Sequence, residues 1–215
     1  MMVGMDSDTF LARLAALGPS PRMGRVFDLA KEFIDLPLPE VEKLLDRPEH
    51  LARVGAASIM DKQARRKKTP VEQRRALFEL YLRRHDAINT WDLVDLGCVW
   101  VVGGYLFDQG LPRDVLYDLA RSADTWQRRT AIVSTLYFVR KGDVADTYAI
   151  AEILLDEPQD LVRKAVGGLL REAGNKDRAG LLSFLDRYAK TMPRVMLRYA
   201  TERLDPADRS RYLTK

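Results

Sequence analysis

The feature that most constrains the fold of this chain is a helical pattern that repeats about every 35 residues. Apolar residues recur with a 3.6-residue period in nearly every segment, and no segment shows the alternation of a half-buried strand. Clusters of Pro, Gly and Asp interrupt the pattern, so that the expected helices are roughly 10–17 residues long. The chain is therefore predicted to be all-α.

The interruptions also place the expected helices along the chain. In order they span residues 8–17, 25–34, 39–46, 49–65, 71–84, 90–108, 112–121, 125–139, 144–155, 160–173, 178–189 and 193–204. We expect a single domain over residues 1–215, in which residues 1–48 form N-terminal capping helices and residues 49–204 form the repeats. Residues 205–215 are expected to be a C-terminal tail.

Four similar tetrapeptides end in an alanine and define the repeat. They are Arg53–Ala56, Arg128–Ala131, Val162–Ala165 and Leu197–Ala200. The last three alanines lie 34 and 35 residues apart, and the first precedes them by close to two such periods, which places the missing member near Asp95. Helix pairs at this period are typical of an α-solenoid of HEAT-like repeats. The prediction is a C-shaped solenoid with a basic concave surface.

Arginine recurs two residues before the repeated alanine, at Arg129, Arg163 and Arg198. One phase of a solenoid faces one surface, so these side chains, with Arg128 and Arg171 nearby, are expected on one side of the stack. Two interpretations stay open: contacts with phosphates, which fix position rather than sequence, or solvated arginines and salt bridges between repeats. Five cations between Lys62 and Lys68 and a net charge of +4 favour a polyanionic partner.

Asp95 is the acid that solvation or capping explains least. Asn89 or Thr90 can cap the helix that follows, and Asp92 in the first turn suits the positive end of the helix dipole. Asp95 lies one turn further, at the start of a largely apolar run, where a carboxylate is costly unless it is paired or exposed in a cleft. Trp91 precedes it by four residues and shares its helix face. We interpret Trp91 and Asp95 as a candidate site.

Other features exclude several classes of protein. No apolar run approaches the ~18 residues needed to cross a bilayer, and the first residues do not read as a secretory signal. The single Cys98 excludes a disulfide framework, and two histidines make a metal centre unexpected. Phosphate-cradling, Rossmann and serine-hydrolase motifs are absent. We therefore expect a cytoplasmic protein without metal or nucleotide cofactor.

An ordered set of short motifs resembles a known family. The motifs are Trp91-Asp92-x-Val94-Asp95, then Ala120-Arg121-Ser122 leading to Trp126-x-Arg128-Arg129-Thr130-Ala131, then Arg163-Lys164-Ala165 leading to Leu170-Arg171-Glu172. Together they look like the AlkD-type DNA alkylation repair proteins, which are HEAT-like repeat DNA glycosylases. The resemblance covers roughly residues 51–204.

The resemblance implies a site as well as a fold. Asp95 matches the catalytic aspartate of the family and Trp91 its cleft tryptophan. The pair Arg128 and Arg129 contains the match to the cleft arginine, for which Arg129 is favoured. Arg171 matches a second arginine that contacts DNA. Trp126 is interpreted as a wedge between repeats, with a DNA contact as the alternative, and Arg163 and Arg198 are candidate phosphate contacts.

The chain departs from the family at one position. The family often has a second cleft tryptophan just ahead of its Leu-Arg pair, whereas this chain has Gly167 and Gly168 there. The loss of an aromatic wall would weaken contact with the nucleotide and could reduce activity or change the lesion accepted. Some branches of the family bind unusual DNA structures without excising bases, so this departure bears on the expected activity.

The resemblance implies base excision repair. We expect a glycosylase that removes cationic N3- or N7-alkylated purines, such as 3-methyladenine and 7-methylguanine, from double-stranded DNA. It would act as a monomer without cofactor, membrane or obligatory protein partner, in the cytoplasm and on the nucleoid when bound to DNA. The alternatives are a non-catalytic HEAT-repeat protein that binds branched or bent DNA and a scaffold that binds proteins.

Overall fold

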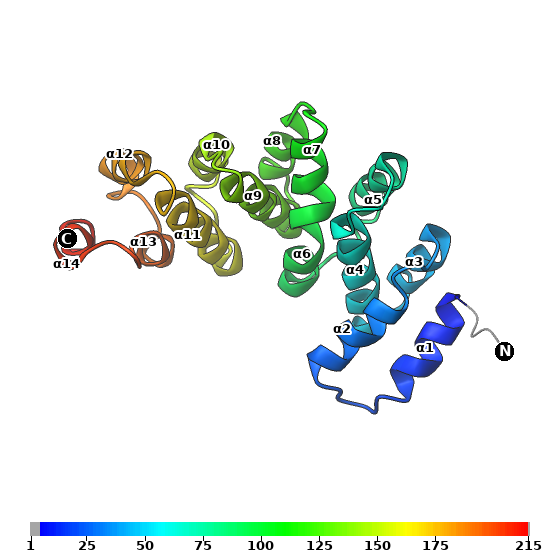
Figure 1. Cartoon of the computed structure of the whole chain (residues 1–215). Coiled ribbons are helices and arrows are strands. Elements are labelled where there is room, and N and C mark those ends of the chain that lie inside the picture. The colour runs from blue at the N-terminus through cyan, green and yellow to red at the C-terminus, as the bar shows by residue number, and fades with distance from the viewer. Residues whose placement is uncertain (1–4, 215) are drawn as a thin grey trace. The chain divides into compact units, whose positions relative to one another are not determined.

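The computed structural model describes residues 5–214, and every regular element in that range is a helix. The chain divides into two compact units, Met1–Tyr105 and Leu106–Lys215. Both units are built from consecutive helix pairs (Figure 1). None of the helices within residues 5–214 is long and apolar enough to cross a bilayer.

The first unit contains three helix pairs. The pairs are α1 (Ser7–Ala15) with α2 (Met23–Glu32), α3 (Leu38–Leu45) with α4 (His50–Arg65), and α5 (Val71–Arg83) with α6 (Trp91–Cys98). A π-helical segment, η1 (Val99–Gly104), continues α6. The second helices pack side by side, because α4 contacts both α2 and α6. The first helices form the other layer, in which α3 contacts α1 and α5.

Helix α4 is the core of the first unit, and most of its residues are buried. Small residues make this possible, because they let neighbouring helices approach closely. The ring of Phe10 from α1 occupies the space that a side chain at Gly55 would need. The tetrapeptide Arg53–Ala56 therefore marks a tightly packed helix, as its resemblance to the later repeats predicts.

The second unit continues the same plan. After α7 (Tyr105–Asp108), whose first residue closes the first unit, come α8 (Asp114–Ala120) with α9 (Thr125–Arg140), α10 (Ala145–Ile153) with α11 (Asp160–Gly174), α12 (Arg178–Tyr188) with α13 (Arg194–Ala200), and finally α14 (Pro206–Leu213). Here α11 packs against both α9 and α13, so second helices again lie side by side.

Hydrogen bonds join side chains about one repeat apart in both units. The Ser7 hydroxyl donates to Glu40 at 2.7 Å, 33 residues away, and Arg53 donates to Asn89 at 2.8 Å, 36 residues away. In the second unit the hydroxyl of Tyr117 donates to Asp146 at 2.6 Å, 29 residues away. These contacts hold one helix pair to the next, and they confirm the predicted all-α helical repeat.

Three features differ from the sequence-based expectation. The expected α-helix at residues 90–108 contains the π-helical segment η1. Its six residues are apolar or glycine, so their pattern does not distinguish a π-helix from an α-helix. Helix α14 lies in the expected tail, where Asp205 accepts from the backbone N–H of Asp208 and Pro206 opens the helix. Helix α3, expected as part of a cap, packs on α4 as the first helix of a pair.

Candidate functional site

The first unit contains a pocket of about 420 Å³ between α2, α4 and α6, here called the Trp91 pocket. Its lining is mostly apolar and includes two carboxylates. The lining residues are Met23 and Phe27 from α2, Val54 from α4, and Trp91, Asp92, Asp95 and Leu96 from α6. The pocket therefore brings the two predicted site residues, Trp91 and Asp95, together with residues about 40 to 70 positions earlier in the chain.

Trp91 and Asp95 occupy neighbouring turns of one helix face. Helix α6 begins directly after Thr90, so Trp91 is its first residue and Asp95 follows one turn later. The Trp91 side chain is 52% exposed and Met23 is 39% exposed, whereas Asp95 is half-buried. An exposed indole and thioether at the mouth of one pocket offer an apolar surface to a ligand.

Asp92 also lines the pocket, but its carboxylate has a structural role. The Thr90 hydroxyl donates to Asp92 Oδ1 at 2.6 Å, and His50 Nε2 lies 2.7 Å from Asp92 Oδ2. Burial opposes ionisation of Asp92, but the hydrogen bonds from Thr90 and His50 outweigh it and lower the pKa of the carboxyl. Thr90 thus caps α6 by position, while its hydroxyl binds Asp92 instead of the backbone. These bonds fix the start of α6 against α4.

The predicted arginines lie in the second unit, where Arg128 joins two helix pairs. Its Nε and Nη2 donate to the two carboxylate oxygens of Glu157 at 2.6 and 2.9 Å, and Nη1 donates to the carbonyls of Ser122 and Ala123 at 2.9 and 2.8 Å. The Arg128 side chain is 12% exposed and that of Glu157 is 0% exposed. For Arg128, these contacts favour a salt bridge between repeats.

The other arginines do not share one environment. Arg129 is buried and donates to the carbonyl of Leu161, so it does not line a common surface with Arg163 and Arg198. Arg163 is half-buried and donates to the carbonyl of Glu157 at 2.6 Å and to Asp160 at 2.9 Å. Arg198 is exposed on α13. The physical reason for the difference is that the start of α9 is covered by the next helix pair.

Two further predicted residues have defined contacts in the second unit. Arg171 is half-buried and forms ion pairs with Glu172, at 3.3 Å, and with Glu202. Trp126 is half-buried near the start of α9, where the Asp124 carboxylate accepts from its backbone N–H at 2.8 Å. The DNA-contact roles of these residues stay predictions.

The two glycines that replace the expected aromatic differ from each other. A side chain at Gly167 would meet the carbonyl oxygen of Met196, and its Cβ would lie 2.6 Å from the Cβ of Tyr199. A side chain at Gly168 would meet nothing within 4 Å. Gly167 is therefore required for the close packing of α11 on α13, whereas Gly168 borders open space.

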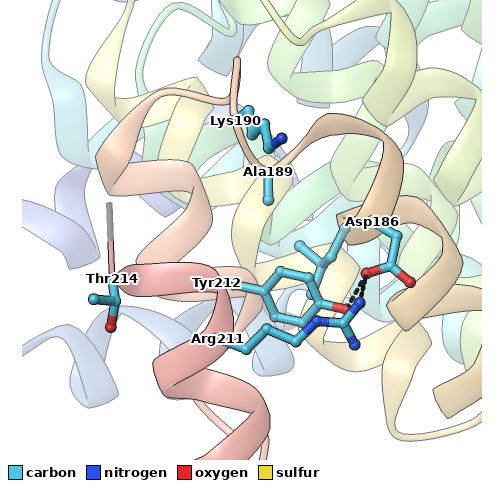
Figure 2. A pocket seen from close by; sticks show the side chains of 7 residues that line it. Asp186, Ala189, Lys190, Arg211, Tyr212 and Thr214 are labelled. Carbon is cyan, nitrogen blue, oxygen red and sulfur yellow. Dashed lines mark hydrogen bonds and ion pairs between the residues drawn. The ribbon is translucent and has the colours of Figure 1, made fainter.

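A larger pocket of about 620 Å³ lies in the second unit beside α12 and α14. Its lining is Leu185, Asp186, Ala189, Lys190, Arg211, Tyr212 and Thr214. Figure 2 shows the guanidinium of Arg211 and the hydroxyl of Tyr212 converging on Asp186, each at 2.7 Å. Burial and the bond to Asp186 raise the pKa of Tyr212 to about 12. These polar groups hold α14 in place, and no sequence motif falls here.

The sequence does not identify Met23 and Phe27 of α2 as residues of the Trp91 pocket. Met23 and Phe27 are spaced by four residues, which places both on one face of α2, but this spacing is equally typical of a core face. Within residues 5–214, no group of three or more His, Cys, Asp or Glu side chains is arranged to hold a metal ion.

Comparison with known proteins assigns the family. The sequence profile of the family described as "DNA alkylation repair enzyme" matches residues 21–204, a range that includes α2 to α13 and therefore the whole Trp91 pocket. No curated protein matches the chain. The chain thus belongs to the DNA alkylation repair enzyme family and acts in the repair of alkylated DNA.

Proposed function

We propose that this protein is a DNA glycosylase that excises cationic N3- and N7-alkylated purines from duplex DNA by hydrolysing the N-glycosidic bond. The observation that carries the proposal is the half-buried Asp95 carboxylate beside the exposed Trp91 indole in a mostly apolar pocket. This pair stands at the positions that the resemblance to AlkD-type proteins gives to the catalytic aspartate and the cleft tryptophan.

The chemistry needs only a fixed carboxylate and a water molecule. An alkylated purine already carries a positive charge, so it leaves with the electrons of the N-glycosidic bond as a neutral base. The deoxyribose then gains oxocarbenium character, which the Asp95 carboxylate stabilises electrostatically. A water molecule adds to C1′, and the carboxylate orients this water or accepts its proton. The products are the free base and an abasic site.

The apolar part of the pocket provides binding. The Trp91 indole can stack on the sugar or hold the cationic base through a cation–π contact. Met23 and Phe27 add apolar surface to the pocket that the two carboxylates also line. Their contribution is to exclude water from the reacting centre. We assign Asp92 to positioning, because Thr90 and His50 already bind it.

The arginines divide into two groups in this proposal. Arg163, Arg171 and Arg198 contact DNA phosphates and so fix the position of the duplex, and Trp126 is a further candidate DNA contact. Arg128 and Arg129 instead hold successive helix pairs together, because their guanidinium groups bind Glu157 and the carbonyl of Leu161. The protein would act as a monomer on alkylated double-stranded DNA, without cofactor, in the cytoplasm.

The proposal is tested by an excision assay on N-methylated duplex DNA, run beside a binding titration at several salt concentrations. We expect release of methylated purine together with binding that weakens as salt increases. Tight, salt-sensitive binding to branched or bent DNA without any release would overturn the glycosylase and establish the architectural alternative. Negligible affinity for DNA at physiological salt would instead indicate a protein-binding scaffold.

A further inference from the structure

We infer that Lys62 forms an anion subsite at the α2 side of the Trp91 pocket and contacts a DNA phosphate that flanks the nucleotide held there. This inference rests on the proposed DNA-directed function, but it does not depend on base excision. Neither the family motifs nor the catalytic proposal uses this residue.

The position of Lys62 follows from two helices that also form the pocket. Val54, Ser58 and Lys62 are spaced by four residues along α4, so they share one helix face, and Val54 lines the pocket. The Lys62 Nζ lies 5.7 Å from the centroid of the Phe27 ring, and Phe27 also lines the pocket. The ammonium group therefore stands at the edge of the pocket, across the Phe27 ring.

The environment of Lys62 is unfavourable for a purely structural lysine. The side chain is half-buried, and its ammonium group donates a hydrogen bond to the neutral hydroxyl of Ser58 at 3.1 Å. Within residues 5–214 it forms no ion pair with a carboxylate, and the adjacent Asp61 binds Arg65 at 3.3 Å. Burial lowers the pKa of Lys62, and attraction to the nearby carboxylates of Asp61 and Asp28 does not outweigh it. A partly desolvated ammonium with remaining N–H donors is a preformed receptor for an anion.

The surroundings identify the anion as a phosphate of a polyanion. Arg65 follows Lys62 on the same helix, and its guanidinium lies 5.3 Å from the centroid of the Trp100 ring. Lys67 and Lys68, just after the end of α4, are exposed and form no ion pair among the described residues. Five cations within seven residues at the end of α4 suit a polyanion such as a nucleic acid strand, and a single small anion would not need them.

The experiment measures binding of an undamaged DNA duplex as a function of salt, for the full chain and for Lys62→Gln. The plot of log K against log salt has a slope of about −0.9 for each phosphate neutralised. We expect Lys62→Gln to reduce this slope by about one such contact and to weaken binding several-fold at fixed salt. Lys62→Arg should restore both quantities. Lys176→Gln, which removes the same charge from an exposed position, should change neither.

Thermal unfolding separates this role from a structural one. Lys62→Met should leave the melting temperature unchanged or raise it, because it removes a costly partly buried charge. An unchanged salt slope in Lys62→Gln, or an equal loss in Lys176→Gln, would overturn the inference while leaving base excision intact. A reduced slope in a protein that releases no base would support the subsite and overturn only the glycosylase. Absence of DNA binding by the natural chain would overturn both.

Discussion

Among single residues, two acids three positions apart on α6 line the same pocket in different surroundings. Asp92 accepts hydrogen bonds from Thr90 and His50, and these bonds lower the pKa of its carboxyl. The ionised carboxylate therefore stabilises the start of α6. Asp95 faces the same pocket beside an exposed indole. Position along the helix predicted that Asp92 falls in the capping turn and that Asp95 lies one turn beyond it, and a catalytic role of Asp95 stays a prediction.

The rest of the pocket was not predictable at this scale. Met23 and Phe27 reach Trp91 only because α2 and α6 both pack on α4, and this arrangement depends on contacts between distant segments. The pairing of His50 with Asp92 across 42 residues is of the same kind. A single sequence reports helix faces, but it does not report which faces meet.

The two adjacent glycines of α11 give a matched test of packing. Gly168→Ala should stabilise the protein by about 0.5–1 kcal/mol, because alanine is the better helix former and the space is open. Gly167→Ala should destabilise it by about 1–3 kcal/mol despite the same propensity gain, because the new Cβ meets the Met196 carbonyl and Tyr199. Urea unfolding of both variants measures the difference. Equal effects of the two substitutions would contradict the close packing of α11 on α13.

At the scale of helices, the sequence predicted the elements better than their connections. Helix bounds agree within a few residues from α1 to α13, because apolar periodicity and Pro/Gly breaks are local signals. Residues 205–215 are expected to be a tail, but Asp205 and Pro206 start helix α14 there. The repeated arginines were expected on one surface, but Arg128 and Arg129 are covered by the helix pair that follows.

The Arg128–Glu157 pair predicts a stability defect. Both side chains are almost completely removed from solvent, so removing one partner leaves a buried charge uncompensated. Arg128→Ala should cost about 3–5 kcal/mol of unfolding free energy, measured by urea denaturation. The double variant Arg128→Met with Glu157→Leu should recover much of that loss. A stable Arg128→Ala protein with weakened DNA binding would show instead that Arg128 contacts phosphate.

The contact between α1 and α3 predicts a dependence on acid. Glu40 on α3 accepts from Lys43 Nζ at 2.6 Å and from the Ser7 N–H and hydroxyl at 2.9 and 2.7 Å, and these bonds lower its pKa from 4.5 to about 2. A lowered pKa stabilises the fold at pH above the ordinary value, and this contribution is lost as pH falls toward 2. The natural chain should therefore be more stable than Glu40→Gln at pH 6.

Unfolding curves between pH 6 and pH 2 provide the measurement for Glu40. The difference between the two proteins should narrow as the pH falls below about 4.5, because protonated Glu40 resembles glutamine. A stability difference that stays constant over this range would show that the carboxylate charge does not hold α1 to α3.

At the scale of the whole molecule, the repeat of about 35 residues was the strongest prediction. Side-chain hydrogen bonds that span 29 to 36 residues recur within both units, where they join successive helix pairs. Arrays of helical repeats typically bind extended partners such as DNA. The family match over residues 21–204 spans both units, in agreement with one function for the array.

Single-turnover excision with saturating N-methylated duplex measures whether Asp95 drives base release. The natural chain should release methylated purine. Asp95→Asn should slow this release by more than about 100-fold while its DNA affinity stays nearly unchanged. Asp118→Asn, which removes the same charge from an exposed position on α8, should release base at the natural rate. Release by Asp95→Asn at the natural rate would contradict the account.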